Sequence, residues 1–218
     1  MPAIPINDQP QSGVDISQAA REVFIVVMGV SGTGKSTLGT ALAEKLGMPY
    51  VEGDDLHPKS NVDKMSSGVP LTDADREPWL RTIRLTAESR IAEIRALDSG
   101  VRKRGVVITC SALKRYYRDI LRGKVRFGSS SKQPPYGTSN GVESDLSTYF
   151  VWINGSKELL EERIGKRQGH FFKASMLESQ MRTLESPEGE EGVVVVPLEV
   201  DTDEQVRIAV EGLNLPQQ

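Results

Sequence analysis

The segment Gly29–Ser36 reads Gly-Val-Ser-Gly-Thr-Gly-Lys-Ser and fits the pattern G-x-x-x-x-G-K-[ST]. Glycines at these places let the backbone curl so that successive N–H groups converge on one anion. A helix that begins after such a loop adds the positive end of its dipole. In this arrangement Lys35 would reach the β- and γ-phosphates of a nucleotide, and the Ser36 hydroxyl would bind Mg²⁺. The sequence therefore predicts a nucleotide-binding loop made of Gly29, Val30, Ser31, Gly32, Thr33, Gly34, Lys35, Ser36 and Thr37.

This loop alone predicts a site and not a reaction, because GTPase switches, motor ATPases and small-molecule kinases all carry it. No Asn-Lys-x-Asp follows a buried strand, which disfavours a guanine-specific switch. The apolar run Val106–Thr109 continues into Cys110 and Ser111 and lacks the Asp that assists magnesium in hydrolytic ATPases. A nucleotide-dependent switch that captures a protein partner remains an alternative to a phosphoryl-transfer enzyme.

A carboxylate suited to phosphoryl transfer follows the second predicted strand. Asp54 and Asp55 come directly after Tyr50–Glu52, and ligands of doubly wound sheets bind beyond the carboxyl ends of the strands. Asp54 is therefore the candidate that orients an acceptor hydroxyl and takes its proton, a role worth roughly 10²–10⁴ in rate. It could also hold magnesium through water, or be a carboxylate solvated in a turn.

Basic residues near the end of a later predicted helix are candidates for closing over a transferring phosphate. Arg163 and Arg167 are four residues apart and share one helical face. Gly165 and Gly169 offer hinges for a lid at about 163–175, and guanidinium groups stabilise charge on a transferred phosphoryl group. The alternative is that these cations only complement the helix dipole.

Further candidates for substrate contacts lie in turns and at strand ends. The chain has only two histidines, His57 and His170, each in a segment with Gly or Pro, where each is either a substrate or lid contact or a hydrogen-bonding loop residue. Lys114 follows the strand expected at 106–109, and Arg76 could face either the site or the packing around it. Trp79 fits the core best. No Cys or His spacing supports a zinc site.

Strands and helices are expected to alternate along the chain. The β-branched runs predict strands at 23–28, 50–52, 106–109, 148–153 and 193–198, and the helical periodicities predict helices at 37–46, 60–67, 76–97, 115–121, 157–167, 174–184 and 203–213. Alternation of this kind predicts an α/β fold with a doubly wound parallel sheet of about five strands flanked by helices. Pro197 places the last strand at an edge. A helix cap is expected at 72–75.

The organisation of the chain follows from composition. Residues 1–20 are expected to be a flexible arm and 21–218 a single domain, with a Ser- and Gly-rich surface insertion at about 125–147. The net charge of −3 and 38% apolar content indicate a globular protein without nucleic-acid partners. A single cysteine, Cys110, excludes a disulfide framework. No secretory signal or membrane-length apolar run is visible, so the expected location is cytoplasmic, away from membranes.

Several longer segments resemble the gluconokinase family, small P-loop kinases related to shikimate and adenylate kinases. The specific stretches are Glu52-Gly-Asp-Asp-Leu-His-Pro58, Asp75-Arg-Glu-Pro-Trp-Leu80, Cys110-Ser-Ala-Leu-Lys-Arg-Tyr-Tyr-Arg-Asp119 and Gly169-His-Phe-Phe172. The resemblance covers about residues 23–210. Two departures stand out: Glu52 occupies a place where the family often has Asp, and the 125–147 connection is longer than usual.

The resemblance implies a helical substrate region, a mobile lid and ATP-dependent phosphorylation of the terminal hydroxyl of D-gluconate, with Mg²⁺, to give 6-phosphogluconate. Asp54 then resembles the acceptor-side carboxylate, and Arg76, Lys114 and His170 resemble substrate or lid contacts. Arg76, Lys114 and His57 also suit an anionic, hydroxyl-rich ligand. Family likeness suggests a homodimer, although the sequence has no decisive apolar seam. Kinases for shikimate or a nucleoside monophosphate remain the alternatives within this class.

Overall fold

The central sheet has five strands, all of whose neighbours pair in parallel. The computed structural model describes residues 22–97, 104–125, 146–166 and 174–215. Its strands are β1 (Glu22–Met28), β2 (Tyr50–Val51), β3 (Arg104–Thr109), β4 (Ser147–Asn154) and β5 (Val193–Pro197). Their order is β2-β3-β1-β4-β5. The predicted strands are confirmed, and β5, which ends at the proline, lies at an edge as expected.

The middle of the sheet is fully buried on both faces, as its β-branched sequences predict. β1 lies between β3 and β4, and Val26 pairs with both Ile108 and Phe150. All three side chains are completely buried. The parallel register brings the carboxyl ends of β1, β2 and β3 to one edge of the sheet. The loops that carry the candidate residues therefore meet there.

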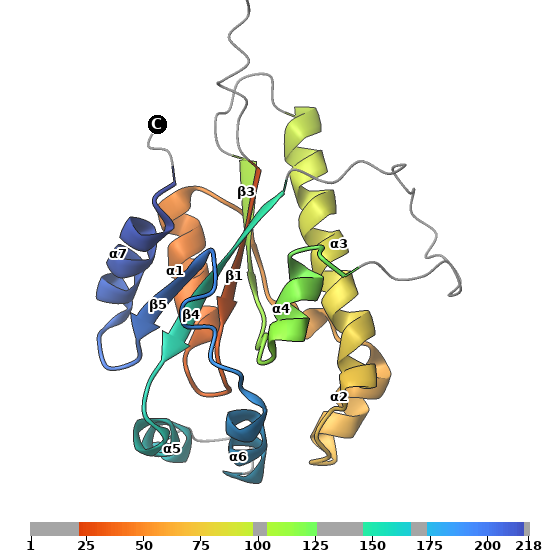
Figure 1. Ribbon diagram of the computed structural model, residues 1–218, viewed down its shortest axis with the longest axis vertical. Coiled ribbons are helices and arrows are strands. Elements are labelled where there is room, and N and C mark those ends of the chain that lie inside the picture. Colours follow the sequence, from red (N-terminus) through yellow and green to blue (C-terminus); the bar gives the residue numbers. More distant parts are fainter. Residues whose placement is uncertain (1–21, 98–103, 126–145, 167–173, 216–218) are drawn as a thin grey trace, which may run out of the picture.

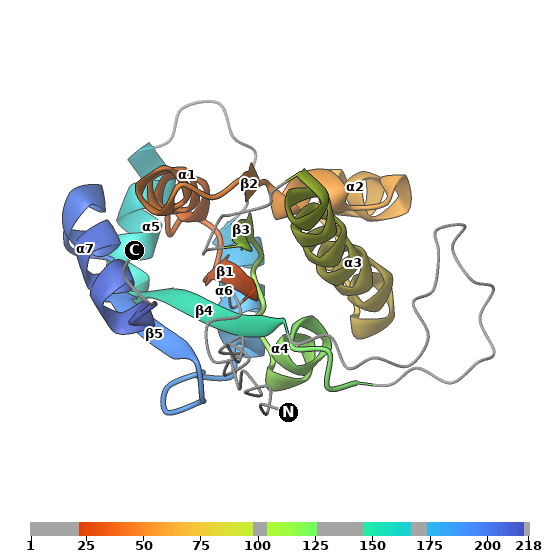
Figure 2. The ribbon, with the colours of Figure 1, turned by 90° about the horizontal axis from the view of Figure 1, so that it is seen from above.

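Seven helices surround the sheet in the described part of the chain. They are α1 (Lys35–Leu46), α2 (Lys59–Ser66), α3 (Asp73–Leu97), α4 (Arg115–Leu121), α5 (Lys157–Lys166), α6 (Ala174–Thr183) and α7 (Thr202–Leu213). Viewed from above, α1 and α7 cover one face of the sheet, and α3 and α4 lie on the other (Figure 2). The architecture is the doubly wound one that the sequence predicts.

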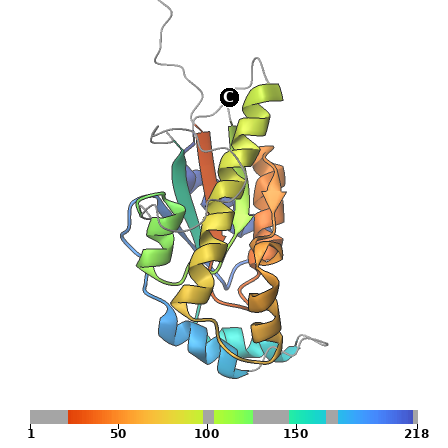
Figure 3. The same cartoon turned by 90° about the vertical axis from the view of Figure 1, so that its right-hand side faces the viewer.

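Helix α3 begins at Asp73, three residues before the predicted start, because its first turn is capped. The Thr72 N–H donates to Asp75 Oδ2 at 2.7 Å, and the Asp75 N–H donates to Thr72 Oγ1 at 3.3 Å. This reciprocal pair satisfies backbone donors that a helix start otherwise leaves open. The expected cap at 72–75 is thus confirmed, and α3 runs along almost the whole length of the molecule (Figure 3).

One end of the molecule collects the pieces that bear on chemistry. The strands point toward α5 and α6, which lie beyond their carboxyl ends, with α2 at the same end (Figure 1). The expected N-terminal arm, the 126–145 part of the expected insertion and the 167–173 part of the expected lid lie outside the described residues. None of the described helices is both long and apolar enough to cross a membrane.

Candidate functional site

A pocket of about 700 Å³ opens at the carboxyl end of the sheet. This volume is within the range of about 300–1,000 Å³ typical of small-ligand sites. Its walls come from the loop after β1, the turn after β2, the α2–α3 region and helices α5 and α6. Its lining includes Ser31, Gly32, Lys35, Ser36, Asp54, His57, Arg76, Trp79, Ile164 and Gln180.

The P-loop (Gly29–Ser36) joins β1 to α1 and directs backbone donors into this pocket. Its glycines adopt positive φ angles, including 87° at Gly32 and 88° at Gly34, which residues other than glycine rarely adopt. Gly34 caps α1 without a side-chain bond to the first turn, so the helix presents its N–H groups and positive dipole end to the pocket. Lys35 Nζ donates to the Val30 carbonyl at 3.1 Å. The loop is thus shaped to hold an anion.

Helices α5 and α6 pack directly against the P-loop. A Cβ atom built on Gly32 would lie 2.8 Å from Ile164 of α5, so only glycine fits this contact. The Ser31 N–H donates to Oε1 of Gln180, from α6, at 2.7 Å. Gln180, in the stretch 180–187 that also fits the family, is therefore a site residue to which the sequence analysis assigned no role.

The Glu52 carboxylate lies behind the P-loop and accepts hydrogen bonds from three sides. Tyr50 Oη donates to it at 2.7 Å, and the Thr109 hydroxyl donates to its other oxygen. The Ser36 hydroxyl is a third partner. Burial alone would raise the pKa of Glu52, but the bonds from Ser36, Thr109 and Tyr50 outweigh it and hold the pKa below its ordinary value. Glu52 is therefore ionised at neutral pH.

The turn after β2, a 3₁₀ helix at Gly53–Leu56, is fixed by bonds to two other elements. The Gly53 N–H donates to Thr109 Oγ1 of β3 at 3.0 Å, and Trp79 Nε1 of α3 donates to the Gly53 carbonyl at 2.8 Å. A Cβ atom on Gly53 would lie 1.8 Å from the Thr109 carbonyl oxygen, so glycine is required for this approach. The turn and its carboxylates are held in one place.

Asp54 projects from this turn into the pocket. Its side chain is 73% exposed to the pocket space, although protein surrounds the recess in which it lies. Burial raises the pKa of Asp54; the positive charge of Lys35 opposes the rise, and the charges of Glu52 and Asp55 add to it. Asp54 thus faces the P-loop lysine across the pocket.

The pocket wall also includes Arg76, which is oriented by two contacts. Its Nη1 donates to the Leu71 carbonyl at 2.6 Å and lies 3.4 Å from the Tyr117 hydroxyl. Asp73 accepts from that tyrosine hydroxyl and from Lys114 Nζ, the latter at 2.8 and 2.9 Å. Lys114 is therefore directed toward Asp73 and does not line the pocket, whereas Arg76 does.

The structure brings together most of the predicted site residues, but not all of them. The P-loop residues that line the pocket face Asp54, His57 and Arg76 across it. The side chains of Val30 and Thr33 are buried beneath the loop. Arg163 donates from Nη2 to the Leu198 carbonyl at 2.7 Å and does not line the pocket. Arg167 and His170 lie outside the described residues.

Trp79 has two roles, of which the sequence predicted one. Its side chain is only 2% exposed and belongs to the core, as expected. It also forms part of the pocket wall, where its ring stacks against His57 with 3.9 Å between centroids. Burial, followed by the charge of Arg76, lowers the pKa of His57 to about 4.

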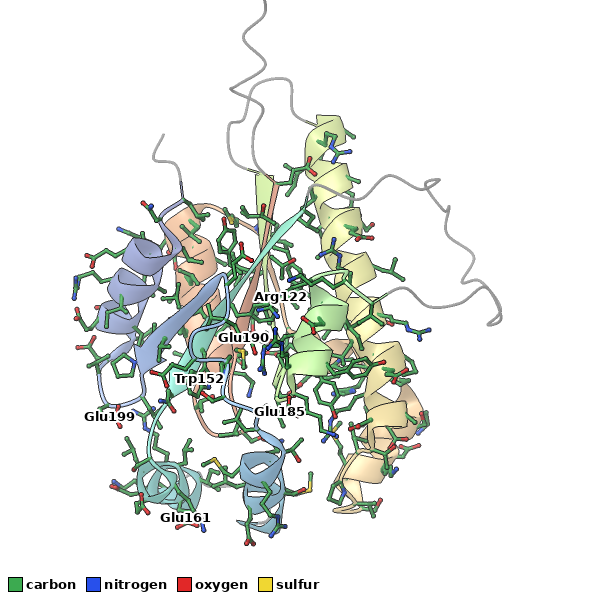
Figure 4. All side chains as sticks on the ribbon, viewed as in Figure 1. Arg122, Trp152, Glu161, Glu185, Glu190 and Glu199 are labelled. Atoms are coloured by element: carbon green, nitrogen blue, oxygen red, sulfur yellow. The ribbon has the colours of Figure 1, made fainter. Side chains whose placement is uncertain are left out.

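A second concave region of about 390 Å³ lies between α4 and the segment before β5. Arg118, which is fully buried, and Arg122 both donate to Glu190, and the Glu185 carboxylate accepts from the Arg115 N–H. Figure 4 shows Arg122, Glu190 and Glu185 gathered over the sheet, away from α5. These charges pair with one another, so we assign this region a structural role.

Comparison with known proteins gives consistent matches over most of the chain. The family model described as an AAA domain matches residues 24–187. Gluconokinase of Gluconobacter oxydans is 45% identical over 83% of this chain and 85% of that protein. Thermosensitive gluconokinase of Escherichia coli is 37% identical over 81% of this chain and 78% of that protein. The crystal structure of a gluconokinase from Sinorhizobium meliloti is 43% identical, with a TM-score of 0.66, covering 87% of this chain and 90% of that one.

Proposed function

Because this chain belongs to the gluconokinase family, we propose that the pocket between the P-loop and α2 is where its reaction takes place. The activity is ATP-dependent phosphorylation of gluconate, which yields 6-phosphogluconate and ADP. The observation that carries the assignment of the pocket is the position of Asp54. It lies opposite Lys35, near enough that the lysine charge opposes the rise in the pKa of Asp54.

The P-loop binds the nucleotide. The N–H groups of the loop and of the first turn of α1 bind the phosphates. Lys35 stabilises the negative charge that develops on the γ-phosphoryl group during transfer. Lys35 now donates to the Val30 carbonyl, a contact that it exchanges for phosphate oxygens when nucleotide binds. Gln180 accepts a hydrogen bond from the Ser31 N–H and so fixes this part of the loop against α6.

The turn after β2 and the start of α3 bind the acceptor, gluconate. Gluconate is a carboxylate with many hydroxyls, which calls for a cation and for mixed donors and acceptors. Arg76 supplies the cation, and the Asp54 carboxylate orients the terminal hydroxyl and takes its proton as the phosphoryl group arrives. The raised pKa of Asp54 makes it a stronger base than a free aspartate. Arg163 and Arg167 are proposed to contact the transferred phosphate, and Lys114 and His170 to be substrate or lid contacts.

Mg²⁺ fits the oxygen donors beside the P-loop. The Ser36 hydroxyl is hydrogen-bonded to the ionised Glu52 carboxylate, and hard oxygen ligands of this kind suit a cation that keeps several of its waters. Ser36 would hold the ion directly, and Glu52 would anchor its waters. When bound, Mg²⁺ neutralises charge on the β- and γ-phosphates.

The assignment of the pocket is tested by ADP release in the presence of gluconate, shikimate or a nucleoside monophosphate. We expect gluconate to stimulate ADP release by the wild-type protein, and Asp54→Asn and Lys35→Met to abolish the stimulation. Asp63→Asn, at an exposed α2 residue whose carboxylate pairs with Lys59 on its own helix, is the matched control and should stay active. If Asp54→Asn retains full gluconate-stimulated turnover, the proposed site is wrong.

A further inference from the structure

His57 lies in the wall of the pocket with its side chain buried. Its side chain is 4% exposed, and its ring is stacked on Trp79 at an interplanar angle of 15°. Its Nε2 atom faces Asp54, with 4.0 Å between Nε2 and Asp54 Oδ1. The opposite ring nitrogen, Nδ1, faces Asn61 of α2, with 3.3 Å between Nδ1 and Asn61 Nδ2.

The contacts of Asn61 decide which nitrogen of His57 carries the proton. Asn61 Nδ2 lies 2.8 Å from the carbonyl oxygen of Asp75, which can only accept. The amino group of the amide, and not its oxygen, must therefore occupy this position. The second hydrogen of the same amino group then faces His57 Nδ1. Nδ1 accepts, so the proton of the neutral ring is on Nε2, the atom that faces Asp54.

The packing around Asn61 and the contacts of Asp75 hold the Asn61 amide in this orientation. Asn61 is 3% exposed and is the buried residue of α2. Its partner Asp75 is in the first turn of α3, where its carboxylate is fixed by Thr72 and Lys64. The tautomer of His57 therefore follows from the packing of α2 against α3.

The ring is also kept uncharged. Burial, and then the positive charge of Arg76, lower the pKa of His57 to about 4. The charged groups that face the ring are Arg76 from α3 and Asp54 from the turn that carries His57 itself. At neutral pH the ring has a single N–H donor, directed at Asp54, and no lone pair on that side to act as a base.

We propose that His57 is a positioning residue: its Nε2–H donates to the Asp54 carboxylate and orients it toward the acceptor hydroxyl, and Asn61 sets the tautomer that makes this possible. The exposed Asp54 side chain needs to approach by only about 1 Å to reach hydrogen-bond distance. The positioning role rests on the function proposed above, whereas the tautomer does not.

The tautomer is tested by ¹⁵N NMR of the full chain labelled at histidine. The chain has two histidines, and the signals lost in His57→Phe identify those of His57. We expect Nε2 to be protonated and Nδ1 unprotonated at pH 7. A proton on Nδ1, or a doubly protonated ring at this pH, would overturn the proposal whatever the activity of the protein.

The positioning role is tested by comparing His57→Phe with His57→Gln. Phenylalanine keeps the stacking on Trp79 and lacks the donor, whereas glutamine supplies an N–H₂ donor. We expect His57→Phe to lower kcat about tenfold with the KM for ATP unchanged, because one hydrogen bond to the reacting carboxylate is lost. We expect His57→Gln to recover most of that loss. The acid limb of the kcat profile should move to higher pH in His57→Phe, because the Asp54 carboxylate loses a donor that favours its charged form.

Equal losses in both variants with an unmoved acid limb would contradict the positioning role. If the wild-type protein itself does not turn over gluconate, the proposed function fails, and the NMR result still decides the tautomer.

Discussion

The Thr109→Val substitution probes how the turn that carries Asp54 is held. Thr109 is 1% exposed, and its hydroxyl accepts from the Gly53 N–H at 3.0 Å and donates to Glu52. Valine has nearly the same shape but removes both bonds. The buried Gly53 N–H then loses this partner, and Glu52 keeps its bonds from Tyr50, Ser36 and the Asp54 backbone.

The expected cost follows from the lost partner of the buried N–H. A buried donor left without a partner costs about 1–3 kcal/mol. For a chain of this length each kcal/mol corresponds to about 2–4 °C in melting temperature, so we expect a fall of about 2–12 °C. We also expect kcat with gluconate to fall, because Gly53 begins the turn that presents Asp54. Thermal melting followed by circular dichroism and a coupled ADP-release assay measure the two effects.

Thr109→Ser is the matched control, since it keeps the hydroxyl and removes one methyl group that packs near Tyr50 and Gly39. Removal of one buried methyl costs about 0.5–1.5 kcal/mol, so the serine variant should melt somewhat lower than wild type but keep its kcat. The reasoning is refuted if the valine variant keeps its melting temperature and kcat, or if the serine variant loses as much activity as the valine variant.

Three more predictions concern charge. Asp54→Asn should lower gluconate-stimulated turnover by a factor of about 10²–10⁴. The melting temperature of this variant at pH 7 should equal or exceed that of the wild type, because the raised pKa of Asp54 means that folding disfavours its charged form at this pH. A lower melting temperature would contradict this. Because the pKa of Asp54 is raised, kcat/KM of the wild type should begin to fall at a higher pH than an ordinary aspartate would give. A pH profile that stays flat down to the ordinary aspartate pKa would argue against Asp54 as the base. Glu190→Ala should lower the free energy of unfolding, measured in urea, by about 3–5 kcal/mol, because the fully buried Arg118 loses its carboxylate partner. Glu188→Ala, at an exposed residue, should change it by no more than about 0.5 kcal/mol. Similar losses in both variants would refute the role of the buried pair.

The secondary structure could be predicted from the sequence because its signals are local. The runs at 23–28 and 148–153 are apolar and β-branched because both faces of the sheet are covered, and each forms a buried strand. Pro197 lacks a donor and ends an edge strand. The error at the start of α3 came from treating 72–75 as a cap that precedes the helix, when Thr72 alone precedes it and Asp75 already lies in its first turn.

The part of the candidate site that follows strand ends could be predicted from local sequence, whereas Arg76, within α3, was suggested by the family resemblance. The P-loop and Asp54 come directly after β1 and β2, so parallel pairing brings them together. The direction of Lys114 depends on Asp73, 41 residues earlier, and that of Arg163 depends on the Leu198 carbonyl, 35 residues later. Gln180 meets Ser31 across 149 residues. Such contacts follow from tertiary packing, which no local pattern encodes.

The central claim is that Asp54 activates the acceptor hydroxyl opposite a nucleotide held by the P-loop. A crystal structure of the full chain with gluconate and a non-hydrolysable ATP analogue tests it most directly. We expect the phosphates on the Gly29–Ser36 amides and the Asp54 carboxylate within about 3 Å of the terminal hydroxyl of gluconate. An Asp54 carboxylate turned to bulk solvent, with another group on that hydroxyl, would contradict it.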